Sequence, residues 1–488
     1  MIYVVRFFPE IIIKSREVRQ RYIAVLRRSL RTQLKLLNSP ATISGGWDSL
    51  NIDVEGCAED MQERIVNLLT RTPGIDQVLE VRKYPLVDLD GVIALCVAHN
   101  APLIRGKSFC VRCKRVGEHS FTSMDVERQV GSALMLDVID TRVDLDDPQV
   151  PVRVDIHHDV VSIVERIHKG LGGYPLGTQD AVLSLISGGF DSTVSSYLCI
   201  KRGMLTHYCF FRLGGTEHEL AVKEVALYLW LKYGASHRVK FITIPFEEVV
   251  EDIVAKVDNS QMGVVFKRLL YRAASAIADT LKIETLVTGE SVSQVASQTL
   301  ANLAVIDRAT DKLVIRPLAT MDKREIIDVA RAIGTEDFVK NVPEYCSVIS
   351  VKPTTRARLG RVEAQEALVD EALFTKAIAN AEFQMIDRVI EGIDRRNKDP
   401  LLYCVSGDDV TIIDIRHPEE EEKNPLDVEV PGREILKIPF YELRTRFASL
   451  PNTKRYALYC ERGVMSRLHA SHLQEEGHAN VRVFRPAK

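Results

Sequence analysis

Residues 187–192, which read Ser-Gly-Gly-Phe-Asp-Ser, place hydroxyl, glycine and acidic residues directly after the apolar run Ala181 to Ile186. A glycine pair lets the backbone approach an anion, and the serines add hydroxyl donors. A helix that begins near Asp191 would point its free N–H groups at the same place, where they favour negative charge. The spacing therefore predicts a cradle for the phosphates of a nucleotide, although a plain turn at a strand end can carry the same glycine pair.

A second reactive residue is Cys460, which follows the strand-like run Tyr456 to Tyr459 and precedes a helix predicted from Ser466 to about Glu476. Loop N–H groups and the positive end of a helix stabilise an anionic sulfur at such a position. A protein tyrosine phosphatase has a similar loop, but it needs arginine at the place of Ser466, and here arginine comes one residue later. Cys460 is therefore predicted to be a reactive thiol, and the alternative is a buried core cysteine.

Other cysteines give weaker signals. Cys346 lies on a predicted loop, where a single cysteine is usually inert, although this one could face the same active site. Cys110 and Cys113 have the spacing of half a zinc or iron–sulfur site. No second pair follows them at a suitable distance, and the residues between them are typical of a strand. We therefore predict no metal site from cysteine.

Basic residues are concentrated near the start of the chain, although the net charge is only −3. Residues 1–40 hold nine Lys and Arg against two acids, whereas residues 41–90 hold four against ten. A further basic segment contains Phe109, lies close to Phe121 and has no acid. A basic patch with interleaved aromatics suits a nucleic-acid backbone, and the alternative is a solvated charged face. The basic residues of this segment are Arg105, Lys107, Arg112, Lys114 and Arg115.

The composition limits the class of protein. A length of 488 residues suggests three or four domains. Apolar residues make up 46% and charged residues 27%, which is typical of a globular protein, and no apolar stretch is long enough to span a bilayer. Residues 1–15 are expected to form a strand rather than a signal peptide. Nine irregularly spaced cysteines indicate reduced thiols, so we expect a cytoplasmic protein.

The elements that must position the two reactive loops alternate between strands and helices from residue 181 onward. Such alternation predicts an α/β fold with a doubly wound parallel sheet. Ligands bind at the carboxyl ends of such strands, where residues 187–192, 214–215 and 289–290 would converge. The predicted strands cover 181–186, 205–211, 238–244, 285–288 and 410–413. The predicted helices cover 17–37, 61–69, 218–233, 267–282, 322–333 and 362–395, the last of which leads to a boundary at 397–400.

These motifs resemble known families. The loop over 187–192 resembles the PP-loop of ATP pyrophosphatases, and no lysine follows the glycines as a Walker motif requires. The Cys460 loop, together with Asp-Ile-Arg at 414–416, resembles a rhodanese, whose cysteine carries a persulfide. A basic front end, a PP-loop and a rhodanese-like end in this order resemble the tRNA 4-thiouridine synthetases over essentially the whole chain.

The resemblance implies a ferredoxin-like domain over 1–62, a THUMP RNA-binding domain over 63–167, a PP-loop ATP pyrophosphatase domain over 168–396 and a rhodanese domain over 404–488. It implies RNA contacts from the basic segment named above. The implied ATP contacts are Leu185, Ile186, Ser187, Gly188, Gly189, Asp191, Ser192, Lys267, Gly289 and Gln298. The implied persulfide loop is Cys460 followed by Glu461, Arg462, Gly463, Val464, Met465 and Ser466.

The chemistry implied by the resemblance is thiolation of tRNA at uridine eight. The uridine is adenylated by ATP, with Asp191 and magnesium positioning the charges. A cysteine desulfurase loads a persulfide onto Cys460, which supplies the sulfur. Cys346 is the implied disulfide partner of Cys460, and a thiol reductant reopens the disulfide. The family also gives sulfur to the carrier protein of thiamine thiazole synthesis.

Two other functions fit parts of the chain. A PP-loop amidotransferase or synthetase would adenylate a carboxylate or a small base, but it needs neither Cys460 nor the basic front end. A sulfur relay for thiazole synthesis alone would leave the nucleotide site inactive. Ser187, Asp191 and Lys267 argue against an inactive site.

Overall fold

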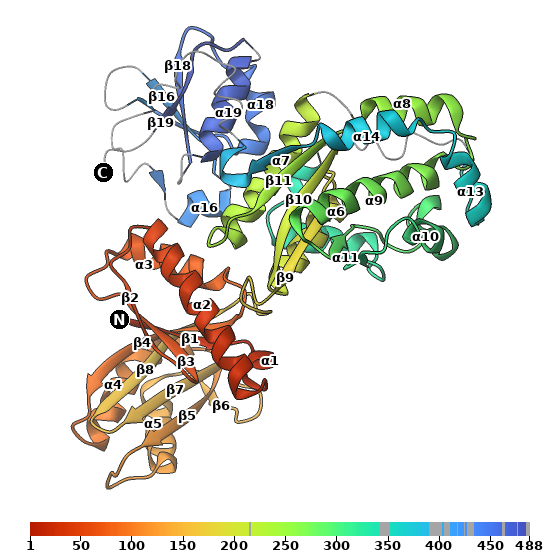
Figure 1. Ribbon diagram of the computed structural model, residues 1–488. Coiled ribbons are helices and arrows are strands. Elements are labelled where there is room, and N and C mark those ends of the chain that lie inside the picture. The colour runs from red at the N-terminus through yellow and green to blue at the C-terminus, as the bar shows by residue number, and fades with distance from the viewer. Residues whose placement is uncertain are drawn as a thin grey trace. The chain divides into compact units, whose positions relative to one another are not determined.

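The computed structural model describes residues 1–213, 216–340, 352–389, 403–404, 410–416, 418–423, 425–426, 434–460, 464–475 and 477–484. The chain forms two compact units, Met1–Thr178 with Lys201–Gly203, and Gln179–Ile200 with Met204–Lys488 (Figure 1). Cys346, residues 461–463 and the predicted converging pair 214–215 lie outside the described residues. None of the described helices is both long and apolar enough to cross a membrane.

The first unit is built on one eight-stranded sheet with the order β2-β3-β1-β4-β8-β7-β5-β6. β1 pairs antiparallel with β3 and β4, and β4 also pairs antiparallel with β8. The segments predicted as the ferredoxin-like and THUMP domains therefore share a continuous sheet. The strands are β1 (Ile2–Phe7), β2 (Thr42–Gly45), β3 (Ser49–Asp53), β4 (Ile75–Pro85), β5 (Ser108–Val116), β6 (Arg142–Val143), β7 (Val150–His157) and β8 (Val160–Lys169).

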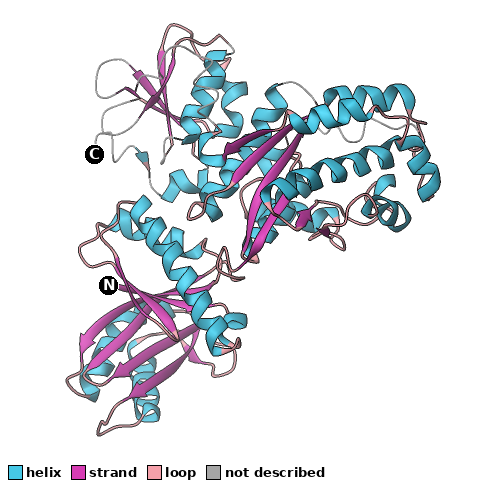
Figure 2. Ribbon diagram, viewed as in Figure 1, coloured by secondary structure: helices cyan, strands magenta, loops and turns pink. Residues whose placement is uncertain are grey.

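The helices of the first unit lie against its sheet (Figure 2). Residues of these helices and of the strands form its two main apolar clusters. α2 and α3 pack with β1, β3 and β4, whereas α4 and α5 pack with β5, β7 and β8. α2 is amphipathic, because Leu26 and Leu30 are fully buried while Arg28 and Arg31 are exposed. The helices are α1 (Pro9–Ile12), α2 (Arg16–Leu36), α3 (Glu59–Thr70), α4 (Leu89–Ile104) and α5 (Ser123–Asp137).

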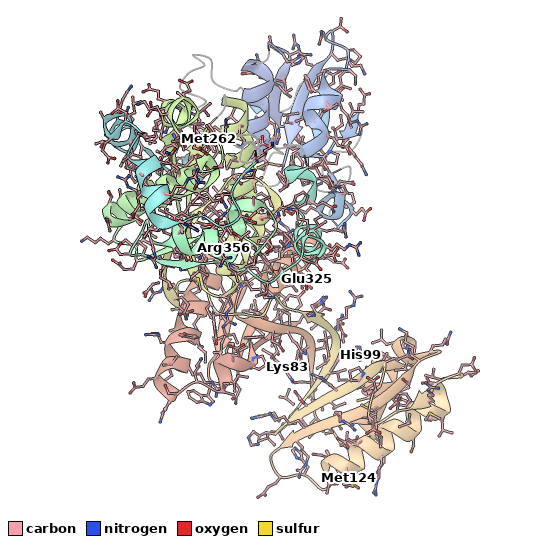
Figure 3. All side chains as sticks on the ribbon, turned by 90° about the vertical axis from the view of Figure 1, so that its right-hand side faces the viewer. Lys83, His99, Met124, Met262, Glu325 and Arg356 are labelled. Carbon is pink, nitrogen blue, oxygen red and sulfur yellow. The ribbon has the colours of Figure 1, made fainter. Side chains whose placement is uncertain are left out.

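Polar contacts add to the packing of α4. One ring nitrogen of His99, labelled in Figure 3, lies 2.6 Å from the Tyr84 hydroxyl of β4. Its other ring nitrogen lies 3.0 Å from a Glu165 carboxylate oxygen of β8. The side chain of His99 therefore joins the helix to two neighbouring strands.

The first strand is shorter than predicted. β1 ends at Phe7 and Pro9 begins α1, so the expectation of a strand over residues 1–15 is wrong beyond Phe7. Proline lacks the N–H that a strand ladder needs, and its fixed φ suits the first turn of a helix. The helices predicted over 17–37 and 61–69 are confirmed as α2 and α3, and the latter helix contains the predicted domain boundary at 62/63.

The second unit contains a six-stranded sheet with the order β13-β12-β9-β10-β11-β14. The first five strands in this order are parallel, which confirms the doubly wound sheet, and β14 pairs antiparallel with β11. The strands are β9 (Gln179–Leu185), β10 (Met204–Arg212), β11 (Lys240–Pro245), β12 (Thr285–Val287), β13 (Leu313–Ile315) and β14 (Glu382–Met385).

The helices of this part confirm the predicted alternation up to residue 340. The π-helix η1 (Trp230–Gly234) directly follows α7, so the helix predicted over 218–233 consists of two segments. The α-helices are α6 (Phe190–Lys201), α7 (Thr216–Leu229), α8 (Glu247–Lys256), α9 (Met262–Leu281), α10 (Leu300–Asp307), α11 (Lys323–Ala332), α12 (Glu336–Val339), α13 (Leu359–Glu366) and α14 (Glu371–Ala379), and the short 3₁₀ helices are η2 (Ala296–Gln298) and η3 (Ile386–Arg388).

The helix predicted over residues 362–395 is wrong for its middle part. α14 ends at Ala379, and β14 then adds an antiparallel strand beside β11. An edge strand needs a neighbour on one side only, so four residues without a strong strand pattern can pair there. Tertiary pairing with β11 therefore determines this element.

The described remainder of the second unit forms a five-stranded parallel sheet with the order β15-β19-β18-β16-β17. The strand predicted over 410–413 is confirmed as β16. The strands are β15 (Tyr403–Cys404), β16 (Val410–Asp414), β17 (Ile435–Lys437), β18 (Arg455–Tyr459) and β19 (Val481–Phe484), and the helices are α16 (Pro418–Lys423), α18 (Phe440–Phe447) and α19 (Val464–Glu475).

His207 on β10 should make the six-stranded sheet sensitive to mild acid. Its Nδ1 accepts the Lys240 N–H at 2.9 Å, and burial, aided by the charge of Lys240, lowers the pKa of His207 from 6.5 to about 4. Above pH 6.5 the imidazole is neutral in both states. As the pH falls from 6.5 to about 4, the unfolded chain gains a proton first, so about 3 kcal/mol of stability is lost.

We expect His207→Asn to flatten this pH dependence, because asparagine retains an acceptor for the Lys240 N–H but does not titrate there. The measurement is hydrogen exchange of the β10 and β11 amides at pH 6.5 and pH 4.5, corrected for intrinsic exchange rates. An equal loss of protection in both proteins would contradict the assignment to His207.

Candidate nucleotide-binding and sulfur-transfer sites

The candidate PP-loop, residues 187–192, lies where the six-stranded sheet of the second unit reverses its strand order. The chain proceeds from β9 to β10 and β11 on one side, and then returns to β12 and β13 on the other. Ligands of doubly wound sheets bind outside the carboxyl ends of the strands at such a reversal. Residues 187–192 follow β9 and residues 288–290 follow β12, so both segments lie at this edge.

Hydrogen bonds within residues 187–192 fix the loop. The Ser187 N–H donates to Ser192 Oγ at 3.1 Å, and the Ser192 hydroxyl donates to the Gly189 carbonyl at 3.2 Å. Gly188 has φ +81°, a conformation that glycine adopts without a Cβ clash. α6 begins at Phe190, which confirms a helix N-terminus beside Asp191. The loop therefore has the form of an anion cradle.

Gly289 brings the end of β12 against the start of α6. A Cβ at Gly289 would lie 2.5 Å from the Asp191 carbonyl carbon and 2.6 Å from the Ser192 nitrogen. Both neighbours are backbone atoms, so no side-chain rotation could make room. The two predicted segments therefore converge through a backbone contact that requires glycine.

Asp191 is held by residues that the sequence analysis missed. Lys323 Nζ lies 2.8 Å from one carboxylate oxygen, and the Gln294 amide donates to the other at 2.8 Å. Lys323 is the first residue of α11, where a cation is disfavoured by the helix dipole. This unfavourable placement is the sequence signal that could have identified it.

Lys267 of α9 joins the same edge through Glu290. Its ammonium donates to a Glu290 carboxylate oxygen at 2.7 Å, and the Glu290 side chain is almost fully buried. Burial alone would raise the pKa of Glu290, but the charges and hydrogen bonds of Lys267 and Arg316 outweigh it and lower the pKa to about 2. The carboxylate is therefore ionised at neutral pH.

Gln298 has an unsatisfied acceptor. It ends η2, and its side-chain oxygen is buried and, among the described residues, accepts no hydrogen bond. Such an oxygen needs a donor, which a ligand could supply. Of the other predicted contacts, Leu185 ends β9, and the N–H of the buried Ile186 donates to the Cys209 carbonyl at 2.9 Å.

Cys460 lies directly after β18 and is 8% exposed. The Ser466 N–H of α19 donates to its sulfur at 3.3 Å, and the thiol lies 3.4 Å from the Ser466 hydroxyl. An N–H at the start of a helix stabilises negative charge on sulfur. Met465 is also buried on α19, whereas of Val464 only the backbone is described. Glu461, Arg462 and Gly463 lie outside the described residues.

Asp414, at the end of the strand beside β18, forms a buried ion pair with Arg416. Asp414 ends β16, and the Arg416 guanidinium donates to both of its oxygens, with an Nη2 distance of 2.6 Å. Both side chains are almost fully buried, and the guanidinium lies 5.0 Å from the centre of the Tyr459 ring. This pair therefore fixes the strand end beside Cys460.

The basic segment of the first unit does not form one surface. Arg112 and Lys114 are exposed on one face of β5, whereas Arg115 lies on the other face and is partly buried. Phe109 is fully buried and Phe121 is 9% exposed, so the expectation that aromatics are interleaved in a binding patch is wrong. Alternate residues of a strand face opposite sides, and Phe109 belongs to the inner face.

The remaining basic residues are more accessible. Arg105 and Lys107 are exposed in the turn between α4 and β5. Cys110 and Cys113 are three residues apart on β5 and so face opposite sides, which is incompatible with binding one metal ion. The seven cysteines with described side chains are all free thiols.

Comparisons with known families and proteins identify relatives of this chain. A model described as Thiamine biosynthesis protein (ThiI) matches residues 177–370, and a THUMP domain model matches residues 88–164. The tRNA sulfurtransferase of Pseudomonas syringae pv. syringae is 50% identical over 485 residues, which is 99% of each chain. That of Azotobacter vinelandii is also 50% identical, with the same coverage.

Solved structures show the same fold. A 4-thiouridine synthetase in complex with RNA and bound ATP matches with a TM-score of 0.67 and 22% identity, covering 79% of this chain and 99% of that one. PH1313 from Pyrococcus horikoshii matches with a TM-score of 0.51 and 16% identity, covering 68% and 100%. Because the sequence relatives align over nearly their full length, the chain belongs to the tRNA sulfurtransferase family and is a transferase enzyme.

Proposed function

We propose that the chain makes 4-thiouridine at position eight of tRNA, by adenylating the uridine with ATP and transferring sulfur from a persulfide on Cys460. The main observation in support is that the Cys460 sulfur accepts a hydrogen bond from the Ser466 N–H near the start of a helix. The same chain has a PP-loop candidate at the point where the strand order of its six-stranded sheet reverses. ATP pyrophosphatase chemistry alone does not need this thiol, and a rhodanese alone does not need this loop.

In the first step, the uridine O4 attacks the α phosphorus of ATP and pyrophosphate leaves. The oxygen at C4 becomes part of an AMP leaving group. Backbone N–H groups at the start of α6 and the loop hydroxyls would stabilise the charge that develops on the phosphates. The proposed ATP contacts are Leu185, Ile186, Ser187, Gly188, Gly189, Asp191, Ser192, Lys267, Gly289 and Gln298.

Asp191 is the proposed magnesium ligand. The ion commonly binds through one or two carboxylates together with substrate phosphates, and Asp191 is the carboxylate of the loop. When bound, the ion would neutralise phosphate charge. Lys323, which now contacts Asp191, would keep that carboxylate oriented.

Lys323→Met should lower the rate of tRNA-dependent pyrophosphate release by roughly 10- to 100-fold, since a charged group that positions the phosphate site is removed. The control is Lys312→Met, because Lys312 pairs with Asp279 and Glu284 instead. Equal rates for Lys323→Met and the wild type would exclude a role for Lys323 in this step.

The proposed RNA contacts are the exposed Arg105, Lys107, Arg112 and Lys114, together with Arg115. Arg112 also donates to the Leu145 carbonyl at 2.7 Å, so part of its hydrogen-bonding capacity is used within the protein. The exposed basic face of α2 supports a phosphate-binding role for the first unit.

Replacing Lys107 and Lys114 by alanine should weaken tRNA binding and reduce the slope of log affinity against log salt by about two. Filter binding between 50 and 300 mM salt measures both quantities. An unchanged slope would show that neither lysine contacts phosphate.

In the second step, the terminal sulfur of the Cys460 persulfide attacks C4 and AMP leaves, which joins C4 to Cys460 through two sulfurs. The Cys346 thiolate then attacks Cys460 Sγ. The sulfur–sulfur bond breaks, 4-thiouridine leaves, and a Cys346–Cys460 disulfide forms. A dithiol reductant returns both cysteines to thiols. The persulfide loop is proposed to include Glu461 to Ser466.

The proposed partners follow from these steps. A cysteine desulfurase supplies the persulfide sulfur, and tRNA accepts it. We also propose that the chain gives sulfur to the carrier protein of thiazole synthesis and that it acts in the cytoplasm. The proposed domains are ferredoxin-like (1–62), THUMP (63–167), PP-loop (168–396) and rhodanese (404–488).

The test combines unmodified tRNA, ATP, magnesium, cysteine, a desulfurase and the protein, and follows thiouridine absorbance in the near ultraviolet. Absorbance that needs both ATP and Cys460 is the expected result. A Cys460 persulfide without thiouridine would instead favour a sulfur relay for thiazole synthesis, with an inactive nucleotide site.

A further inference from the structure

The Glu290 carboxylate accepts hydrogen bonds from four side chains. One oxygen accepts from Lys267 Nζ at 2.7 Å. The other accepts from the Tyr271 hydroxyl at 2.7 Å, from Arg316 Nε at 2.8 Å and from the Thr288 hydroxyl at 3.1 Å. These donors come from α9, from the residue after β12 and from the residue after β13, so two other parts of the chain fix the position of Glu290 besides its own segment.

Arg316 is held in turn by two groups. Its guanidinium donates to the Tyr271 hydroxyl at 3.0 Å and to the Asp307 carboxylate, with an Nη1 distance of 3.2 Å. Tyr271 is 2% exposed and the Arg316 side chain 13% exposed. The arginine therefore holds Glu290 through contacts that do not involve Lys267.

The Lys267 side chain, unlike that of Arg316, depends on Glu290 for its position. A lysine side chain has a flexible four-carbon stem, and its ammonium could sample many positions. Here its side chain is 18% exposed, and the Glu290 oxygen defines where the ammonium lies. Glu290 directly follows Gly289, whose backbone contacts the start of α6. The carboxylate therefore connects Lys267 to the same contact that supports the phosphate loop.

We infer that Glu290 is a positioning residue that fixes the Lys267 ammonium for nucleotide binding, with Arg316 holding the carboxylate in place. This inference rests on the proposed function, in which Lys267 contacts ATP. Glu290 itself need not touch the nucleotide. Replacing Glu290 should then affect ATP binding only while Lys267 is present. A carboxylate with a merely structural role would affect ATP binding whether or not Lys267 is present.

A double-mutant cycle tests this dependence. Glu290→Gln, Lys267→Met and the double variant are compared with the wild type by equilibrium dialysis of ATP and by tRNA-dependent pyrophosphate release. Glu290→Gln alone should weaken ATP binding roughly tenfold, because a rotamer-rich side chain must then be ordered on binding. In the Lys267→Met background, Glu290→Gln should change ATP affinity less than twofold.

Equal effects of Glu290→Gln in both backgrounds would overturn the inference, because Glu290 would then act independently of Lys267. The matched control is Glu366→Gln. Glu366 is a similarly buried carboxylate that holds Arg268 and Arg272 of the same helix, α9. It should leave ATP affinity unchanged, whereas a loss equal to that of Glu290→Gln would indicate general disturbance of α9.

A second variant keeps the test decisive if Glu290→Gln does not fold. Glu290→Asp preserves the charge beside Arg316 but withdraws the carboxylate from Lys267 by one methylene. We expect weaker ATP binding that again disappears in the Lys267→Met background, and full affinity would overturn the inference. Failure of the proposed function looks different, since the wild type itself would then bind no ATP, and the inference would fall with it.

Discussion

Replacing Cys460 by serine is expected to abolish 4-thiouridine formation while a first round of ATP-dependent pyrophosphate release continues. Serine retains an acceptor for the Ser466 N–H that lies 3.3 Å from the sulfur, so the loop should keep its form. A hydroxyl cannot hold the transferable sulfur that a thiolate carries as a persulfide. Near-ultraviolet absorbance of the tRNA and pyrophosphate release, followed in one reaction, separate the two steps.

Two further cysteine variants complete the experiment. Cys57→Ser is the control, because Cys57 is a half-buried free thiol of the first unit. The Cys57→Ser protein should be as active as the wild type. Cys346→Ser should also stop repeated thiolation while ATP and tRNA binding persist. Thiouridine formation at the normal rate by Cys460→Ser would remove the persulfide from the mechanism. Loss of ATP or tRNA binding in either Cys346→Ser or Cys460→Ser would contradict their assigned roles.

Replacing Gly289 by alanine should reduce ATP affinity by roughly 10- to 100-fold, because losing one backbone hydrogen bond to a charged phosphate costs about 1.5–3 kcal/mol. The new Cβ would lie 2.5 Å from the Asp191 carbonyl carbon. The backbone segments after β9 and β12 must therefore separate. Overpacking of this kind also destabilises a protein by about 1–3 kcal/mol. Equilibrium dialysis of ATP and thermal unfolding measure the two effects.

Gly263 provides the matched control on α9. A Cβ there meets no atom within 4 Å, and the residue is the second of the helix. Gly263→Ala should leave ATP affinity unchanged and should stabilise the protein by less than the roughly 1 kcal/mol of a helix interior. Unchanged ATP affinity in Gly289→Ala would mean that the loop tolerates separation of the two segments.

Local sequence patterns predicted the elements around the phosphate loop because each one depends on neighbouring residues. The apolar run before Ser187 and the helix beginning beside Asp191 are examples, and both are confirmed. Cys460 between a strand and a helix was predicted for the same reason. Glycine and apolar spacing report such features directly.

Contacts between distant residues were not predictable in this way. Lys323 reaches Asp191 across 132 positions, and Arg316 reaches Glu290 across 26. No local pattern encodes these distances. The prediction that Phe109 belongs to a binding patch was wrong, because a charged segment can still have an apolar inner face. The prediction of a helix across residues 382–385 was wrong, because pairing with β11 makes these residues the strand β14.

The continuous sheet of the first unit determines where this protein can be cut. A fragment that starts at residue 63 would lose β1 and so strip β4 of one row of hydrogen-bond partners. β4 is 11 residues long, and a bare edge of that length invites pairing with another chain. The two halves of this sheet should therefore unfold as one cooperative block. A fragment that keeps this sheet whole would need to begin at residue 1 and extend to about residue 178, where the first unit's main segment ends.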